Sequence, residues 1–280
     1  MYPFIHIFGL KIPSYGLMMA LAFAAAILLS CYRVKKAGLS VDKILDIALT
    51  VLICGMAGAY LLYIFVTYSF EEIFECIKDG SFRVFKDGGL VFYGGLIAGV
   101  LSGFLFCRIK KIDFNEYAAV IVPSLPLAHA IGRVGCFLAG CCYGRVCDTA
   151  ISVIYKNPIG GAPVGVPVFP IQLVESGFNI IIFAVLLIYT AKRMKSISGL
   201  FLYLGLYAIE RFVLEYFRAD EIRGIFLGLS TSQWISVLLF AASVTAFIII
   251  HIKDRRSENQ SDVIEDEGSV LEEKTAEQEK

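Results

Sequence analysis

The sequence lacks several features that mark familiar classes of protein. It carries no net charge, with 25 basic and 25 acidic residues, and we expect no nucleic-acid partner. Its cysteines include no C-x2-C pair, the arrangement that structural zinc sites use. The pattern C-x4-C-C-x4-C, formed by Cys136, Cys141, Cys142 and Cys147, therefore favours a structural or locally oxidised role. We expect neither a metal ion nor an organic cofactor.

Apolar residues dominate what is present. They make up 58% of the 280 residues, whereas an ordinary soluble domain contains roughly 45–50%. We therefore predict an all-α polytopic membrane protein. Runs of about 17–25 apolar residues are long enough to cross a bilayer. Seven such runs are present: Tyr15–Tyr32, Ile44–Tyr68, Leu90–Arg108, Tyr117–Arg133, Ile171–Ala191, Gly199–Phe217 and Gln233–Ile252. No positively charged segment precedes the first run, so we expect a retained span rather than a signal peptide.

The basic residues between the runs predict an orientation. One set of loops carries thirteen lysines and arginines and the opposite set carries eight over longer loops. The positive-inside rule then places the N-terminus outside and the C-terminus in the cytoplasm. Residues 257–280 hold nine acidic and two basic residues and no aromatic residue. This composition predicts a disordered acidic cytoplasmic tail after a membrane domain that spans residues 1–256.

The stretch His129–Arg145 is expected to form the floor of an active site. Its sequence, H-A-I-G-R-V-G-C-F-L-A-G-C-C-Y-G-R, follows directly on an apolar run. An arginine such as Arg133 in hydrocarbon costs roughly 2.5–3.5 kcal/mol, so it faces a polar cavity, a partner or a ligand. The glycines allow the backbone to turn and to approach a ligand closely.

A second arginine is expected at a similar depth. Spacings of four, four and three place one set of residues on a single face of the sixth run: Tyr207, Arg211, Glu215 and Arg218. At 1.5 Å per residue, Arg211 lies about 18 Å and Arg133 about 24 Å from the inner end of a hydrocarbon layer about 30 Å thick. Both arginines therefore fall in the outer half.

Other polar residues reach the same layer from the outer side. These are Tyr15, Tyr93, Gln172 and Glu175. A structural salt bridge to Glu175, Glu210 or Glu215 accounts for one arginine. Two arginines together with tyrosines favour a phospholipid head group, because paired guanidinium donors match the geometry of a phosphate.

Five ordered motifs resemble the signatures of prolipoprotein diacylglyceryl transferases. They are S-Y-G-L-M, D-G-G-L-V-F-Y-G-G-L-I-A-G, G-R-V-G-C-F-L-A-G-C-C-Y-G, P-I-Q-L-V-E and G-L-F-L-Y-L-G-L-Y-A-I-E-R-F-V-L-E-Y-F-R-A-D, and S-Q-W-I-S before the last run also fits. The resemblance covers about residues 12–250. It implies a seven-span enzyme of the bacterial cytoplasmic membrane. Such enzymes move the diacylglyceryl group of phosphatidylglycerol onto the lipobox cysteine thiol of a prolipoprotein, with formation of a thioether and release of glycerol phosphate.

The resemblance also assigns roles to residues. Arg133 and Arg211 would hold the lipid phosphate and stabilise its leaving charge. The full catalytic set implied is Arg133, Arg211, Tyr93 and Tyr207. The substrate-binding set implied is Arg133, Tyr15, Gly94, Gly95, Cys136, Gly144, Gln172, Glu175, Glu215 and Arg218.

Some positions depart from the family pattern. Tyr93 stands where the family often has a histidine, Cys136 where asparagine is usual and Cys141 where glutamate is usual. Tyr60 replaces an arginine and Phe169 a histidine. A tyrosine, with an ordinary pKa near 10, is a poor base at neutral pH. The departures therefore bear on the general base and the acceptor more than on the phosphate site.

Two other interpretations follow. A diverged paralogue would bind phosphatidylglycerol and pass the lipid to another acceptor, as the loss of the histidine, asparagine and glutamate indicates. A non-enzymatic protein would bind or transport lipid, although the sequence shows no inverted repeat and no paired broken spans. A retinal-type receptor is disfavoured because the last run, Gln233–Ile252, contains no lysine.

Overall fold

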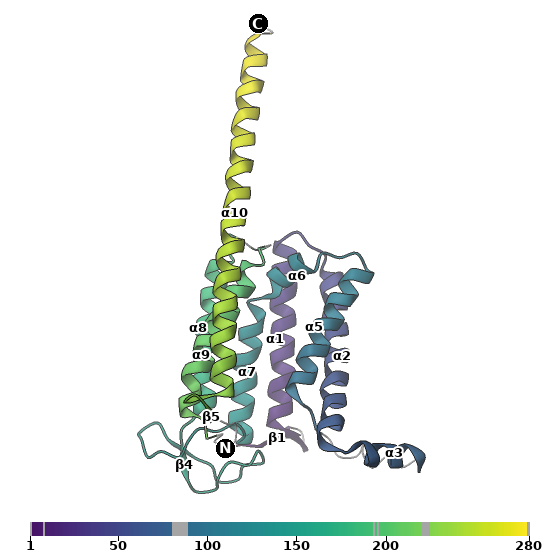
Figure 1. Cartoon of the computed structure of the whole chain (residues 1–280), viewed down its shortest axis with the longest axis vertical. Coiled ribbons are helices and arrows are strands. Elements are labelled where there is room, and N and C mark those ends of the chain that lie inside the picture. Colours follow the sequence, from purple (N-terminus) through teal and green to yellow (C-terminus); the bar gives the residue numbers. More distant parts are fainter. Residues whose placement is uncertain are drawn as a thin grey trace. The chain divides into compact units, whose positions relative to one another are not determined.

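The computed structural model describes residues 2–7, 9–79, 89–192, 194, 196–219 and 225–278. At residues 7, 77, 225, 226 and 255–278 it describes the backbone alone. Asp87 and Gly88 of the third-run motif lie outside these residues. The chain forms two compact units, residues 1–26 with 118–280 and residues 27–117. Each unit is mainly helical (Figure 1).

The predicted helical membrane protein is confirmed. Five helices are long and apolar enough to cross a bilayer within the described residues: α1 (Ser14–Lys36), α2 (Val41–Thr67), α5 (Phe92–Ile109), α8 (Ile171–Tyr189) and the first part of α10 (Thr231–Gln278). Only 11–33% of each span is buried inside the protein. Large apolar side chains therefore cover the outer faces of these helices, as a lipid environment requires.

The fourth predicted span is not one straight helix. It consists of α6 (Phe114–Ile121) and α7 (Ser124–Ala139), which meet at an angle of 49°. Pro123 precedes α7, and a proline has no N–H to continue the ladder of helical hydrogen bonds. Counting this pair as one span gives six spans in the described residues.

The sixth predicted span corresponds to α9 (Ser198–Leu214), whose 17 residues are followed by the 3-10 turn η1 (Glu215–Phe217). The total of seven spans and the orientation of the termini stay predictions. α10 continues to Gln278 through the acidic residues, and the division at Arg256 into a membrane domain and a tail also stays a prediction.

In the larger unit, α8 packs against α7 and α9, and α9 packs against α10. Figure 1 shows α8, α9 and α10 side by side. The core between α8 and α9 contains Ile182 and Leu186, together with Leu206 from α9. Each of α7, α8 and α9 has one polar face, and these contacts bring the three polar faces together.

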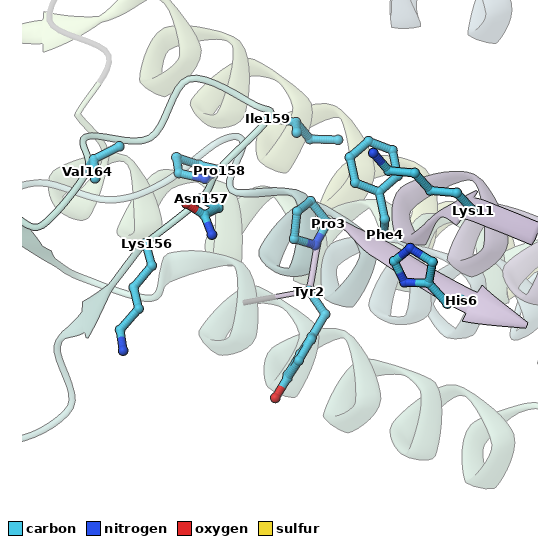
Figure 2. Close-up of a pocket in the computed structure, with 10 residues that line it drawn as sticks. All are labelled: Tyr2, Pro3, Phe4, His6, Lys11, Lys156, Asn157, Pro158, Ile159 and Val164. Carbon is cyan, nitrogen blue, oxygen red and sulfur yellow. The ribbon is translucent and has the colours of Figure 1, made fainter. Parts of the chain in front are cut away.

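Three short hairpins and a loop complete this unit. The hairpins pair β1 (Phe4–Ile7) with β2 (Leu10–Pro13), β3 (Val153–Ile154) with β4 (Pro167–Val168), and β5 (Ile225–Phe226) with β6 (Leu229–Ser230). The first hairpin and residues 156–164 line an open pocket of about 660 Å³ (Figure 2). Neither Arg133 nor Arg211 lines this pocket.

In the smaller unit, glycines allow α2 and α5 to touch along their backbones. α3 (Phe70–Lys78) follows α2. A Cβ atom added to Gly58 would meet the Cβ of Ala98 and lie 2.7 Å from the carbonyl oxygen of Gly94. Gly95 faces the carbonyl oxygen of Gly55 in the same way, at 3.3 Å. This is the small-residue contact expected where membrane helices associate by close packing.

The α2–α5 contact predicts the effect of one added methyl group. Gly58→Ala should lower the thermal unfolding midpoint of the detergent-solubilised protein, because overpacking costs about 1–3 kcal/mol. Gly16→Ala is the matched control, since a Cβ at Gly16 in α1 has no atom within 4 Å. Equal midpoints for the two variants would contradict the close contact between α2 and α5.

Candidate active site

A buried ion pair links α7 to α8. The Nη2 atom of Arg133 lies 2.6 Å from Oε1 of Glu175, and the Glu175 side chain is only 3% exposed. His129 stands one turn before Arg133, with its Nε2 atom 3.2 Å from Nε of Arg133 and 3.5 Å from Oε1 of Glu175. Ser176 adds a hydrogen bond from its hydroxyl to the carbonyl oxygen of Ala130, 2.9 Å long. Arg133 is thus held at a fixed place inside an apolar bundle.

The two contacts of His129 Nε2 exclude each other. This nitrogen accepts from Arg133 only when it carries no proton, and it donates to Glu175 only when it is protonated. An arginine always supplies its proton, and the contact with Arg133 is shorter. The contact with Arg133 therefore uses the lone pair of Nε2, and His129 orients the guanidinium group.

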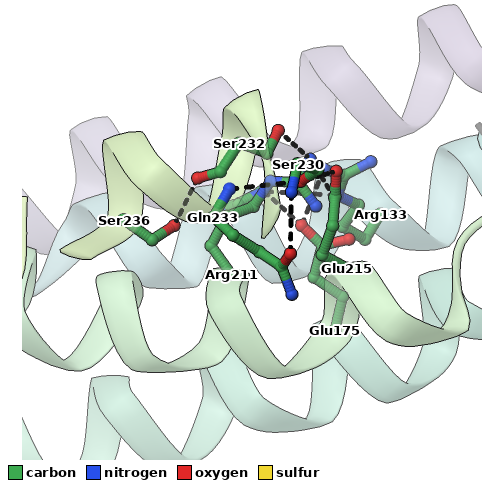
Figure 3. Close-up of polar contacts among 9 residues, drawn as sticks. Arg133, Glu175, Arg211, Glu215, Ser230, Ser232, Gln233 and Ser236 are labelled. Atoms are coloured by element: carbon green, nitrogen blue, oxygen red, sulfur yellow. Dashed lines mark hydrogen bonds and ion pairs between the residues drawn. The ribbon is translucent and has the colours of Figure 1, made fainter. Parts of the chain in front are cut away.

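A second ion pair lies at the end of α9. Nη2 of Arg211 is 2.8 Å from Oε2 of Glu215 and 3.0 Å from the hydroxyl of Ser232. The Oε2 atom of Glu215 has no aligned hydrogen-bond partner among the described residues, so its contact with Arg211 is mainly electrostatic. Its other oxygen accepts a hydrogen bond from Ser230, 2.9 Å long. Figure 3 shows both arginines with these partners.

The start of α10 explains why these serines are in place. Ser230 precedes the helix, and its hydroxyl accepts from the backbone N–H of Gln233 at 3.2 Å. The Gln233 side chain accepts in return from the backbone N–H of Ser230 at 2.9 Å. This reciprocal arrangement is a capping box, which begins a helix and orients its first turn. Ser232 then points toward Arg211.

Further buried polar atoms lie between α8 and α9. The Asn179 amide donates to the backbone oxygen of Glu175 and to Oε1 of Glu210, each at 2.9 Å. Oδ1 of Asn179 and Oε2 of Glu210 have no hydrogen-bond partner among the described residues, although both atoms are buried.

Gly144 packs the loop that follows α7 against the end of α9. It forms an antiparallel bridge with Arg218, and its N–H donates to the carbonyl oxygen of Phe169 at 3.1 Å. A Cβ at Gly144 would lie 2.7 Å from the backbone oxygens of both Phe169 and Phe217. Only glycine fits at this crossing. The stacked rings of Phe169 and Phe217, 5.1 Å apart, cover it.

Gln172 has a structural contact as well as a predicted binding role. Its amide donates to the carbonyl oxygen of Cys141 at 2.7 Å and to the hydroxyl of Tyr155 at 3.2 Å. Tyr155 is fully buried, and burial raises the pKa of its phenol, so the hydroxyl stays neutral. Gln172 therefore fixes the cysteine-containing loop to the start of α8.

The structure brings most predicted site residues of the larger unit together. The Tyr207 ring lies 5.7 Å from that of His129. At Gly135 of α7, a Cβ would lie 3.0 Å from the Met18 Cβ and 3.4 Å from the Tyr15 ring, so Tyr15 packs beside this helix. Cys136 lies one turn after Arg133 on the same helix.

Arg218 corrects one expectation. It does not share a helical face with Tyr207 and Arg211, because α9 ends at Leu214 and Arg218 has extended backbone angles, φ −84° and ψ 153°. The helix stops where Arg218 pairs with Gly144 as a strand.

Three predicted residues belong to the smaller unit. Tyr93 is exposed at the start of α5 and contacts Phe92, with ring centroids 5.9 Å apart. Gly94 and Gly95 lie in the contact with α2, which gives both a packing role. A role of these three residues in substrate binding stays a prediction.

Sequence reasoning missed Asn179 and Ser230, and it gave no individual role to His129 and Ser232, although both lie in stretches that the sequence analysis quoted. The signals were present in the spacing. His129 precedes Arg133 by four residues, and Asn179 follows Glu175 by four, so each pair shares a helix face. Ser230 and Gln233 match the S-x-x-Q signature of a capping box.

Comparisons with known proteins support a specific family. The sequence profile described as prolipoprotein diacylglyceryl transferase matches residues 3–249. A phosphatidylglycerol–prolipoprotein diacylglyceryl transferase of Clostridium tetani is 38% identical over 244 residues, which cover 87% of this chain and 95% of the relative. Phosphatidylglycerol–prolipoprotein diacylglyceryl transferase 2 of Clostridium perfringens is 36% identical, over 89% of this chain and 95% of the relative. A namesake from Dehalococcoides mccartyi is 33% identical, covering 86% and 90%.

The crossing at Gly144 yields a test of the site's construction. Gly144→Ala should lower the unfolding midpoint and the yield of folded protein, because the added methyl group meets two backbone oxygens that cannot rotate away. Gly177→Ala in α8 is the control, since its Cβ would have no atom within 4 Å, and alanine favours a helix over glycine by roughly 0.5–1 kcal/mol. A Gly144→Ala protein as stable as the control would refute the tight crossing.

Proposed function

The chain belongs to the prolipoprotein diacylglyceryl transferase family, and on this basis we propose that it transfers the diacylglyceryl group of phosphatidylglycerol to a prolipoprotein. One observation supports this most directly. Two arginines, on two helices that both pack against α8, each form an ion pair inside an apolar bundle, Arg133 with Glu175 and Arg211 with Glu215. A lipid phosphate is the anion that reaches such a depth from the bilayer.

The phosphate would lie between Arg133 and Arg211. Each guanidinium has five N–H donors. The contacts of Arg133 with Glu175 and His129 use Nη2 and Nε, and those of Arg211 with Glu215 and Ser232 use Nη2. The remaining N–H donors of each guanidinium group would bind the phosphate. Glu175 and Glu215 would hold the two arginines in position.

In the proposed reaction, the thiol of the acceptor peptide attacks the glyceryl carbon that carries the phosphate. A carbon–sulfur bond forms and the carbon–oxygen bond breaks, with its electron pair leaving on glycerol phosphate. Negative charge grows on the leaving oxygen, and Arg133 and Arg211 stabilise it most in the transition state. The chain needs no nucleophile of its own, because the substrate brings the thiol.

The remaining predicted residues take supporting roles in this proposal. Tyr207 beside His129 and Tyr15 beside Gly135 would border the head group, while Gly144 and Arg218 form the rim. Gln172 holds the loop that carries Cys141. The acceptor would be a lipobox signal peptide, and the site would face the outer side of the bacterial cytoplasmic membrane. The family match favours this enzyme over a lipid-binding or lipid-transporting protein.

The arginines can be tested by transfer of labelled phosphatidylglycerol to a lipobox peptide. Arg133→Ala and Arg211→Ala should each lower the rate by roughly 100-fold or more, the cost of losing one preorganised charge donor. Arg108→Ala, at the far end of α5, should leave it unchanged.

A fold control accompanies this test. Arg133→Ala alone leaves Glu175 buried without its partner, which destabilises by about 3–5 kcal/mol. The double variant Arg133→Ala/Glu175→Gln removes that charge and should recover stability but not transfer. Recovery of transfer in the double variant would show that Arg133 serves the fold alone and would refute the phosphate site.

Tyr93 can be tested in the same assay. Because it is exposed at the start of α5, we propose that its hydroxyl contacts substrate rather than acting as the general base. Tyr93→Phe should slow transfer by less than about tenfold, whereas loss of a general base costs roughly 100-fold or more. A loss of that larger size at saturating peptide would assign the base to Tyr93. Tyr60→Phe in α2 is a suitable control.

A further inference from the structure

Three cysteine side chains converge at the end of α7. The sulfur atoms of Cys136, Cys141 and Cys142 all lie within 4.8 Å of one another, and none of the three is in a disulfide. Gly140, with φ 76°, ends the helix and donates its N–H to the backbone oxygen of Cys136 at 2.9 Å. The N–H of Cys141 donates to the same oxygen at 3.1 Å. This turn folds the Cys-Cys pair back onto the last turn of α7.

The surrounding residues hold this loop in place. The carbonyl oxygen of Cys141 accepts the 2.7 Å hydrogen bond from buried Gln172. Gly160 packs so closely that a Cβ there would lie 2.7 Å from the nitrogen of Cys141. Cys142 adopts a left-handed conformation, φ 55°, that favours glycine. A non-glycine residue keeps such a conformation only where its neighbours determine it, and this occurs at ligand sites.

The three sulfurs match the ligand set of a thiophilic cation. Zinc binds thiolate sulfur at about 2.3 Å in tetrahedral geometry, which places sulfurs about 3.8 Å apart. A cation on three thiolates carries a net negative charge. Arg133 lies one turn before Cys136 on α7, and Arg218 forms a β-bridge with Gly144, two residues after Cys142, so two positive charges are close to the cluster. Three protein ligands and one open position are typical of catalytic rather than structural zinc sites.

We propose that Cys136, Cys141 and Cys142 bind a zinc-type divalent cation whose open fourth position receives the thiol of the acceptor peptide. The inference rests on the proposed transferase function. Cys142 is exposed and Cys136 is half-buried, so one side of the cluster opens outward. Cys136 follows Arg133 by three residues, about 4.5 Å along the helix. The acceptor thiol and the lipid phosphate would therefore bind one turn apart.

The cation would supply the acceptor in its reactive form. A thiol that coordinates such a cation loses its proton, here to water. The bound thiolate then forms the carbon–sulfur bond, the carbon–oxygen bond breaks, and the electron pair leaves on glycerol phosphate. One proton and one glycerol phosphate are released for each thioether formed. The thioether is neutral and a weaker ligand, so the product can leave the cation.

Cobalt(II) is a direct probe of this site. The full-length protein, solubilised in detergent, reduced and stripped of metal, should take up one equivalent of Co²⁺ and show visible absorption bands of thiolate-bound cobalt, which Zn²⁺ then removes. Cys136→Ser, Cys141→Ser and Cys142→Ser should each lose or strongly weaken the bands. Cys147→Ser is the control, because its sulfur pairs with Ser152 at 3.2 Å, outside the cluster.

The outcomes separate the cation site from the transferase function. The cation site would be overturned if the reduced wild-type protein showed no cobalt bands, or if the bands were unchanged in all three variants. It would also be overturned if protein alkylated before lysis contained a disulfide within the cluster. A lipobox peptide with cysteine should alter the bands and the same peptide with serine should not. No difference between the peptides would overturn the role of the open position.

The transfer assay completes the separation. If the cation acts on the acceptor, metal-free protein should transfer at least about tenfold more slowly, and added Zn²⁺ should restore the rate. Full transfer by metal-free protein would keep the transferase function and overturn the catalytic cation. Cobalt bands that respond to the cysteine peptide, with no transfer in any metal state, would keep the cation site and refute the transferase function.

Discussion

The buried contact between Arg133 and Glu175 is the constraint on which the larger unit depends. An unpaired charge in hydrocarbon is costly, and the pair is worth keeping only if further polar groups satisfy it. His129 meets that need by accepting a hydrogen bond from Arg133, while Ser176 of α8 bonds to the backbone oxygen of Ala130 and so ties α8 to α7. The contacts that pack these helices together therefore also fix the position of the Arg133 guanidinium group. The site is built before any ligand arrives.

Close backbone contacts make this arrangement possible. Gly135 allows α1 to approach α7 beside Tyr15, and Gly144 allows two loops to cross against Phe169 and Phe217. Neither residue carries chemistry, yet each determines how near a reactive side chain lies to its neighbour. In the smaller unit the same principle joins α2 and α5 through Gly58 and Gly94. Small residues thus allow close backbone packing in each of the two units.

Hydrophobic runs predicted most of the helices to within a few residues, because the cost of exposing backbone in lipid leaves few alternatives. α8 begins at the residue that the sequence indicates, after Pro170. The bend at Pro123 was missed because the apolar run was counted as one continuous helix, although the proline that breaks it is a local signal. The extended conformation of Arg218 was missed because it follows from a contact distant in sequence, the bridge to Gly144. The cysteine cluster was missed because spacing rules assume a C-x2-C turn. Here a helix end and the left-handed Gly140 bring Cys136 and Cys141 together instead.

The most direct test of this account is an experimental structure with a phosphatidylglycerol analogue bound. We predict that its phosphate lies within hydrogen-bond distance of the guanidinium groups of both Arg133 and Arg211, with Glu175 still paired to Arg133. A phosphate that binds elsewhere, while Arg133 and Arg211 contact only Glu175 and Glu215, would contradict the central conclusion. The two arginines would then be structural charges of the fold.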